Sequence, residues 1–283
     1  MCRWLAYSGS PVLLQELLYG PKNSLIVQSL HSRLGAEETN GDGFGVGWYG
    51  AQETPAVFRS IEPAWNDRNL RELADHVTAT TVFAHIRAST GSPVQQTNCH
   101  PFRHGRWLWM HNGFIGDYQK VKRDLVLEID PDLYPEIEGT TDSETLFHLA
   151  LTFGLMDDPI LGLERAVGFI EETARRHGVA DPVQATFGIT DGNRLWAVRY
   201  ASAGRPRTLF ASADVSAIQR LYPENERLQR LRDEDRIVLS EPLVDLPGVW
   251  DEVPESSALI VQPGPDERRP FRPRVERSTA VPA

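Results

Sequence analysis

Strand-like segments lie on both sides of a helical middle, and this order constrains the fold more than any other feature of the sequence. On the N-terminal side, alternating or β-branched apolar residues predict strands at 2–7, within 40–49, at 80–87 and at 107–111. On the C-terminal side, strand patterns return at 183–190, 194–201, 207–211, 236–240 and 257–261. Helical spacing predicts short helices at 11–18, 24–34 and 67–77, and longer ones at 117–128, 142–155 and 159–177. Strands that flank a block of helices, rather than alternate with them, predict an α+β fold.

Length and composition favour one large domain followed by a short tail. The chain has 283 residues, of which 41% are hydrophobic and 24% charged, so it can bury a substantial core. We expect a single domain over residues 2–261. Residues 262–283 are rich in proline and arginine and poor in apolar side chains, so little burial offsets the entropy lost on ordering. This stretch is predicted to be a disordered or loosely docked tail.

Charge and hydropathy argue against several classes of partner. A net charge of −10 disfavours nucleic acid, because Lys and Arg contacts dominate that affinity. No apolar run approaches the roughly 20 residues that span a bilayer, so no membrane segment is expected. The N-terminus also lacks the basic and apolar regions of a secretory signal. A cytoplasmic location is therefore predicted.

No pattern in the chain predicts a metal or a cofactor. The two cysteines, Cys2 and Cys99, allow neither a disulfide framework nor a zinc-binding CxxC pair. The histidines near the middle of the chain match no common spacing of metal ligands. The glycine-rich segment 41–47 lacks both the third glycine of a dinucleotide fingerprint and the lysine of a phosphate loop. Any special cysteine chemistry must come from a single thiol.

Cys2 is the first candidate for that chemistry. Removal of Met1 is sterically easy before a small side chain, and it would leave a thiol and a free α-amine on the same residue. Reference pKa values of about 8.5 for a thiol and about 7.7–8.0 for an α-amine make proton exchange between them nearly thermoneutral. Cys2 would then supply both nucleophile and general base. Taken alone, however, position 2 is better explained as a small residue that begins a strand.

Asn112 and Gly113 are candidates for stabilising negative charge on a carbonyl oxygen. They follow the predicted strand 107–111, so the side-chain amide of Asn112 and the backbone N–H of Gly113 can converge on one point. Two such donors form an oxyanion hole, and the loss of one costs about 2.7–4 kcal/mol of transition-state stabilisation. An ordinary Asn-Gly turn at a strand end is the competing interpretation, and it is the better one for these two residues alone.

Arg87 and Asp142 are candidates for holding the two charged groups of an amino-acid substrate. The planar guanidinium of Arg87 suits a carboxylate, and the carboxylate of Asp142 suits an α-ammonium group. The competing interpretations are a surface ion pair for Arg87 and a helix N-cap for Asp142, ahead of a helix from Ser143 to Leu155. Capping and binding are compatible roles for Asp142.

The ordered set of motifs resembles the class II glutamine amidotransferases, which belong to the N-terminal nucleophile hydrolases. The motifs are Met-Cys at the start, His-x-Arg-x-x-Thr at 85–90, Asn-x-His-Pro at 98–101, His-Asn-Gly at 111–113 and Thr-Asp-Ser-Glu at 141–144. Each is weak alone, but five in order form a strong signal. Residues 42–49 are similar to those of the stand-alone members, which include the γ-glutamyl amide hydrolase of ergothioneine synthesis.

The resemblance implies both a fold and a mechanism. The fold would be a four-layer αββα sandwich, with two antiparallel sheets between helical layers. Cys2 would attack the γ-amide of glutamine or of a γ-glutamyl amide and form a thioester, while Asn112 and Gly113 stabilise the oxyanion. Arg87 and Asp142 would hold the α-carboxylate and the α-ammonium group, and Thr90 would line the carboxylate end. Many members carry Trp and His where this chain has Ala88 and Gly91, so its smaller lining would leave room for a larger leaving group than ammonia.

Several functions remain open from the sequence. Only about 80 residues follow the recognisable region, too few for an acceptor-binding synthase domain of typical size. The chain would then be a self-sufficient γ-glutamyl amide hydrolase, or a glutaminase subunit that delivers ammonia to a separate partner protein. A binding protein that senses glutamine without turnover is disfavoured by the complete set of candidate residues. An N-terminal-cysteine acyl-amide hydrolase is the competing enzyme, but it has no need of both Arg87 and Asp142.

Overall fold

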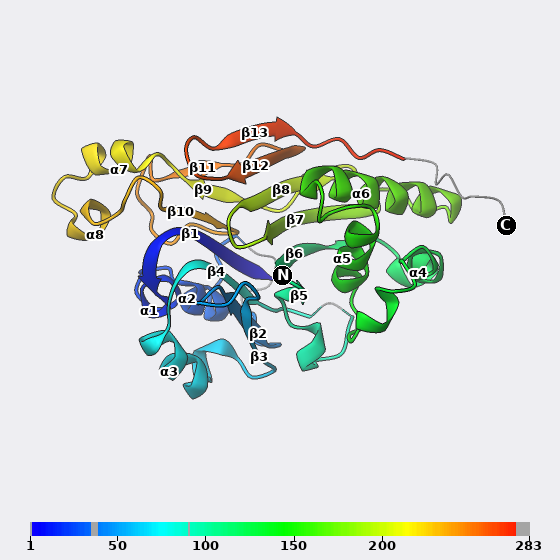
Figure 1. Ribbon diagram of the computed structural model, residues 1–283, viewed down its shortest axis with the longest axis horizontal. Coiled ribbons are helices and arrows are strands. Elements are labelled where there is room, and N and C mark those ends of the chain that lie inside the picture. Colours follow the sequence, from blue (N-terminus) through cyan, green and yellow to red (C-terminus); the bar gives the residue numbers. More distant parts are fainter. Residues whose placement is uncertain (1, 35–38, 90, 276–283) are drawn as a thin grey trace.

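The structure, a computed structural model, describes residues 2–34, 39–89 and 91–275. These residues form two sheets in which every pair of neighbouring strands is antiparallel (Figure 1). The order in the first sheet is β11 (Trp250–Glu252), β9 (Phe210–Ser212), β10 (Arg236–Leu239), β1 (Arg3–Leu13), β4 (Thr78–Ile86), β2 (Phe44–Trp48) and β3 (Ala56–Ser60). The order in the second sheet is β13 (Glu267–Pro270), β12 (Ser257–Val261), β8 (Leu195–Ala201), β7 (Val183–Thr190), β6 (Trp107–Ile115) and β5 (Phe102–His104).

The helices form two groups, one beside each sheet (Figure 1). The first sheet is accompanied by α1 (Leu14–Leu18), α2 (Leu25–Leu30) and α3 (Arg68–His76). The second is accompanied by α4 (Tyr118–Leu127), α5 (Asp142–Thr152) and α6 (Pro159–Arg176). Two further helices, α7 (Val215–Leu221) and α8 (Glu226–Gln229), follow β9, and single 3₁₀ turns occur at Ala64–Asn66, Gln96–Asn98 and Tyr134–Glu136. No helix in the described part of the chain is long and apolar enough to cross a membrane.

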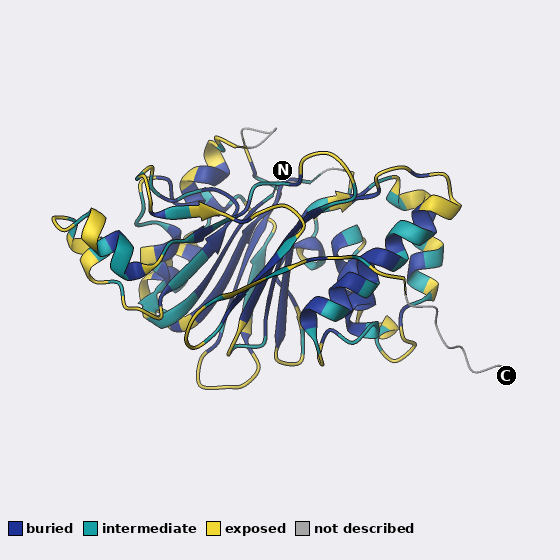
Figure 2. Cartoon of the chain, turned by 90° about the horizontal axis from the view of Figure 1, so that it is seen from above, coloured by how far each residue is buried: buried dark blue, intermediate teal, exposed yellow. Residues whose placement is uncertain are grey.

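Three hydrophobic clusters show how the layers are stacked. One contains Leu5 and Leu70 and lies between the first sheet and its helices. Another contains Trp4 and Met110 and lies between the two sheets, and a third joins the second sheet to α5 and α6. Trp4 and Leu5 enter different clusters because successive side chains of a strand point to opposite faces. Figure 2 shows the strands largely buried in the centre of the molecule. The α+β fold and the four-layer sandwich expected from the sequence are confirmed.

Most predicted elements are present, although several bounds differ. The strand at 183–190 and the strand at 257–261 have the predicted limits. The first strand is longer than predicted, because β1 continues to Leu13 and pairs with the start of β4 after an irregularity between Ser8 and Val12. The helix predicted at 11–18 is therefore reduced to α1, and the one predicted at 24–34 is reduced to α2.

The ordered part of the chain extends beyond the predicted limit at residue 261. Strand β13 pairs with β12, and Phe271 is buried, with its ring edge-on to that of Tyr200. The backbone N–H of Arg274 donates to the carbonyl of Glu164 on α6 at 3.1 Å. The expectation of a loose tail from residue 262 is thus wrong for residues 267–274. Backbone pairing at a sheet edge does not require the alternating apolar side chains that the prediction relied on.

Candidate active site

Cys2 lies directly before β1, on the side of that strand that faces the second sheet. Trp4 and Ala6 belong to the cluster between the sheets, so alternation directs the side chain of Cys2 to the same face. Its Sγ lies 3.6 Å from the carbonyl oxygen of Ala88. Burial raises the pKa of the Cys2 thiol, and the nearby guanidinium groups of Arg87 and Arg3 act in the opposite direction. A half-buried thiol in this setting needs a base to become a nucleophile.

Asn112 lies on the second sheet and faces the same space between the sheets. It is two residues from Met110, which belongs to the cluster between the sheets. On β7 its cross-strand partner is Thr186, whose Oγ1 accepts a hydrogen bond from Trp4 Nε1 at 3.0 Å. This bond joins the strand that starts after Cys2 to the strand beside Asn112. The thiol and the Asn112 amide are therefore directed into the same layer from opposite sheets.

Gly113 is placed so that its backbone N–H is directed away from β7. The N–H of Ile115 donates to Asp142 Oδ2 at 2.7 Å instead of to β7. Because N–H groups two residues apart in a strand point the same way, the N–H of Gly113 also points away from β7. On that side β5 pairs only with residues 107–109 of β6, so no strand in the described part of the chain covers Gly113. A Cβ at Gly113 would lie 1.9 Å from the carbonyl oxygen of Gln184. Only glycine fits this position, and its N–H is available at a free strand edge.

The interpretation of Asn112 and Gly113 as a turn at a strand end is wrong. Strand β6 passes through both residues and ends at Ile115, with Asn112 opposite Thr186 and Gly113 opposite Ala185. The Asn-Gly pair is a strong turn signal in sequence, but long-range pairing with β7 overrides it here. The two donors thus come from a rigid strand rather than from a loop.

The start of α5 is attached to β6 on both sides of Gly113. Besides the bond from Ile115, Asp142 Oδ1 accepts a bond from the N–H of Ser143 at 2.8 Å. The Oγ of Ser143 lies 2.8 Å from His111 Nδ1. Burial raises the pKa of Asp142, and the two backbone N–H groups act against that rise. The N-cap of α5 is Thr141, whose side chain accepts from Glu144 N, so the predicted capping role of Asp142 is wrong by one position.

Arg87 follows β4 and is buried, with 3% of its surface exposed. Its guanidinium donates to the carbonyl oxygens of Asp42 and Pro93 and to the hydroxyls of Ser89 and Ser92, at 2.7–3.2 Å. Within the described residues it has no carboxylate partner, so the alternative of a surface ion pair does not hold. Arg87 orders the loop that follows β4 beside the Ala88 carbonyl. Thr90, in the same loop, lies outside the described residues.

Asn98 connects this loop to the start of α5. Its Nδ2 donates to the carbonyl of Pro93 at 2.9 Å, and its Oδ1 accepts from the N–H of Thr140 at 2.8 Å. Glu144 in turn accepts from the N–H groups of Glu138 and Gly139. Three segments that are far apart in the sequence are therefore held together around the end of β4. A cavity of about 570 Å³ lies beside this connection, lined by Arg59, Gln96, Glu138 and Glu144 among others, and Cys2 is not part of its lining.

His85, His100 and His111 form a buried group beneath the site. The rings of His85 and His100 lie 4.3 Å apart, and His85 Nε2 lies 3.3 Å from the carbonyl oxygen of His111. Burial lowers the pKa of His85 and of His111 to about 3, and it lowers that of His100 well below its ordinary value. Across the described ranges, no three His, Cys, Asp or Glu side chains are arranged to hold a metal ion. All three rings are buried as neutral groups: the His85 and His100 rings pack together, the His111 ring stacks on Phe187, and the contact of His85 with the His111 carbonyl connects the two sheets.

This neutral histidine group predicts that the fold loses stability in mild acid. The pKa of each ring is near 6.5 in the unfolded chain and lower in the folded one, so the unfolded state binds more protons below pH 6.5. Stability is therefore complete above pH 6.5 and is lost as the pH falls toward 3. Each ring contributes about 1.4 kcal/mol per pH unit, or about 4 kcal/mol per pH unit for three. Urea unfolding between pH 4 and 7 measures this slope, and His100→Asn should reduce it by one proton. A slope unchanged in that variant would contradict the prediction.

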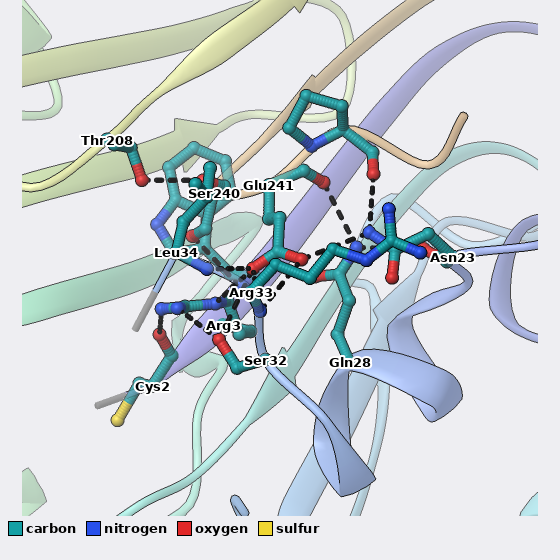
Figure 3. A network of polar contacts seen from close by, with 12 residues as sticks. Cys2, Arg3, Asn23, Gln28, Ser32, Arg33, Leu34, Thr208, Ser240 and Glu241 are labelled. Atoms are coloured by element: carbon teal, nitrogen blue, oxygen red, sulfur yellow. Dashed lines mark hydrogen bonds and ion pairs between the residues drawn. The ribbon is translucent and has the colours of Figure 1, made fainter. Parts of the chain in front are cut away.

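A second network fixes the backbone of Cys2 from the opposite side of β1 (Figure 3). Arg3 donates from Nη1 to the carbonyl of Cys2 at 2.9 Å and from Nε to Glu241 Oε2 at 3.3 Å. Both side chains are almost fully buried. Glu241 also accepts from Asn23 and from the backbone N–H groups of Arg33 and Leu34. Figure 3 shows the Cys2 sulfur directed away from this network. The sequence offered no signal for this pair, whose members are 238 positions apart.

Replacing Glu241 with glutamine is expected to lower the free energy of unfolding by about 3–5 kcal/mol. The reason is that a buried Arg3 cation would lose its only carboxylate among the described residues. Chemical denaturation measures the change. Glu234→Gln is the matched control, because Glu234 is exposed and, among the described residues, accepts a hydrogen bond only from Ser10 Oγ, at 3.1 Å. Equal and small effects of the two substitutions would show that the Arg3–Glu241 pair contributes little.

Two antiparallel sheets packed face to face between helical layers, with a cysteine directly before the first strand, have the architecture of N-terminal nucleophile hydrolases. Residues 21–245 match the family model of class II glutamine amidotransferases. The chain belongs to this family, and it is an enzyme of the amide-hydrolase type.

Relatives cover nearly the whole chain. A probable glutamine amidotransferase, DUG3 of Saccharomyces cerevisiae, is 34% identical over 93% of this chain and 82% of its own length. The γ-glutamyl-hercynylcysteine sulfoxide hydrolase of Mycolicibacterium smegmatis is 28% identical, with 93% of this chain and 96% of that protein covered. Among solved structures, a glutamine aminotransferase class-II domain protein from Silicibacter pomeroyi is similar with a TM-score of 0.72 and 29% identity, covering 96% of this chain and 100% of that one.

Proposed function

We propose that this protein hydrolyses the γ-amide of glutamine or of a γ-glutamyl amide, with Cys2 as the nucleophile. The observation that carries the proposal is the joint placement of Cys2 and Asn112. Their side chains enter the layer between the sheets from opposite sides, at strands joined by the bond from Trp4 to Thr186. Gly113 adds an uncovered N–H beside Asn112. A nucleophile that faces two preorganised donors is the arrangement that acyl transfer requires.

The proposed reaction begins after Met1 has been removed. The free α-amine of Cys2 takes the thiol proton, and the thiolate attacks the γ-carbonyl carbon. The resulting oxyanion accepts hydrogen bonds from the Asn112 amide and the Gly113 N–H. The C–N bond then breaks as the Cys2 ammonium returns a proton to the leaving nitrogen. Water attacks the thioester, glutamate is released, and the thiol is restored.

Arg87 and Asp142 are proposed to hold the two charged groups at the α-carbon of the substrate. Arg87 donates from Nη1 to the Asp42 carbonyl and from Nη2 to its own loop, which leaves the N–H of Nε available. Asp142 accepts backbone bonds and retains further acceptor capacity for an ammonium group. Thr90 is proposed to line the carboxylate end. An acyl-amide hydrolase would have no use for both charges, so this pair favours an amino-acid substrate.

Intact-mass analysis before and after treatment with an electrophilic glutamine analogue tests the proposal. We expect a mature mass without Met1 and the addition of one analogue molecule, which Cys2→Ala would prevent. In parallel, the release of glutamate from glutamine and γ-glutamyl amides is compared with the release of fatty or aryl acids from their amides. A protein that retains Met1 and forms no adduct would lack the proposed base. Glutamate release that appears only with an added synthase would favour the role of an ammonia-delivering subunit.

A further inference from the structure

Arg207 lies in the connection between β8 and β9, beside the start of β1. Its carbonyl oxygen accepts a bond from Arg199 Nε at 2.8 Å. The next residue, Thr208, donates from Oγ1 to the carbonyl of Ser240 at 2.8 Å, and Ser240 Oγ accepts from the N–H of Trp4 at 3.2 Å. Figure 3 shows Thr208 and Ser240 beside the network formed by Arg3 and Glu241. These bonds fix the backbone of Arg207 close to the strand that begins after the nucleophile.

The guanidinium of Arg207 makes no hydrogen bond or ion pair with any described residue. Its Nε is buried and has no acceptor. In contrast, Arg3 pairs with Glu241, Arg199 with Glu252 at 2.8 Å, and Arg236 with Asp266 at 3.0 Å. Removing a cation from water without an anionic partner is unfavourable, so a half-buried free guanidinium indicates a place for an anion that the protein does not supply.

Phe114 places this cation next to the oxyanion donors. The Cζ of Arg207 lies 5.8 Å from the centre of the Phe114 ring, and Phe114 is 39% exposed. Phe114 is two residues beyond Asn112 on β6, so the two side chains share the face toward the first sheet. Burial lowers the pKa of Arg207, the positive charge of Arg3 lowers it further, and the Cys2 thiolate raises it. Arg207 is therefore within electrostatic reach of the nucleophile.

We propose, on the basis of the function proposed above, that Arg207 and Phe114 form a subsite for the leaving group, and that Arg207 binds its carboxylate. The substrates would then be γ-glutamyl amino acids, in which the carboxylate is one carbon away from the scissile nitrogen. Ammonia released from glutamine has no group to occupy this subsite. The planar guanidinium forms two parallel bonds with a carboxylate, and the exposed ring of Phe114 holds the guanidinium plane in place.

A pair of matched substrates tests the subsite. γ-Glutamylglycine and γ-glutamylmethylamide differ only in the carboxylate of the leaving amine. We expect wild-type kcat/KM to be roughly tenfold to a hundredfold higher for γ-glutamylglycine, the range for a charge-assisted bond. Arg207→Gln should remove this preference, mainly through KM, and Arg207→Lys should restore part of it. Arg205→Gln is the control, because Arg205 is exposed in the same segment, and it should keep the preference.

The outcomes separate the subsite from the proposed function. Hydrolysis of both substrates by the wild type without preference would overturn the subsite while the proposed function stands. An equal loss for both substrates in Arg207→Gln, or a shifted pH profile with the methylamide, would show that Arg207 acts on the thiolate or the fold and would also overturn the subsite. If the wild type hydrolyses neither compound nor glutamine, both proposals fail. Melting temperatures of the variants confirm that each is folded.

Discussion

Replacing Cys2 with alanine is expected to abolish amide hydrolysis, with a fall in kcat of at least about 10⁴-fold, as in other hydrolases that lose their nucleophile. The remaining donors, Asn112 and Gly113, would still bind the carbonyl oxygen, but no thioester would form. Glutamate release under single-turnover conditions measures the loss. Cys2→Ser should also be severely impaired, because a serine hydroxyl is a far weaker nucleophile than a thiol at neutral pH.

Cys99→Ala is the control for the loss of a thiol. Cys99 is fully buried and its Sγ contacts the carbonyl oxygens of Ser60 and Gln95, so it has no route to substrate. Its replacement should leave kcat within about threefold of the wild type and cost about 1 kcal/mol of stability. Residual activity in Cys2→Ala above one per cent, with Cys99→Ala also active, would rule out Cys2 as the nucleophile.

Asn112→Ala should lower kcat by about 10²–10³-fold while KM changes little, since an oxyanion donor acts mainly in the transition state. The corresponding free energy is about 2.7–4 kcal/mol. Asn112 is almost fully buried, so unfolding must be measured in the same variant. Steady-state kinetics with the preferred γ-glutamyl substrate separates kcat from KM.

Asn193→Ala serves as the comparison for this substitution. Asn193 is exposed in the turn between β7 and β8, where its backbone N–H donates to Asp191 at 2.9 Å. Its replacement by alanine should leave kcat and KM unchanged. A rise in KM with constant kcat in Asn112→Ala would instead indicate that Asn112 binds the substrate ground state, and the oxyanion role would have to be abandoned.

Periodicity in the sequence located most of the sheets and helices because their side chains enter a core. The elements it missed are short or lie at edges. Strand β3 is half exposed, β5 and β11 span three residues each, and β13 consists of charged residues and a proline. These strands are stabilised mainly by backbone pairing, which leaves no apolar alternation to detect. The prediction failed at the C-terminal stretch for the same reason.

The sequence motifs identified the candidate residues but did not predict how these residues are placed relative to one another. Cys2 and Asn112 belong to different sheets, and only the packing of the sheets brings them to one layer. Arg207 and Glu241 gave no signal, because their roles depend on contacts with residues far away in the sequence. Asn112 and Gly113 did give a local signal, which favoured a turn, but pairing with β7 overrides it and keeps both residues in a strand.

The position of β1 between β4 and β10 affects when an active enzyme can exist during synthesis. The strand after Cys2 is made first, yet one of its neighbours and the carboxylate that pairs with Arg3 emerge about 238 residues later. At 5–20 residues per second, the ribosome needs roughly ten seconds or more to supply them. For most of its synthesis, the nascent chain therefore has the Cys2 thiol but lacks β10 and the Glu241 carboxylate, which hold the start of β1 in position. The chemistry proposed for Cys2 therefore becomes possible only when translation is nearly finished.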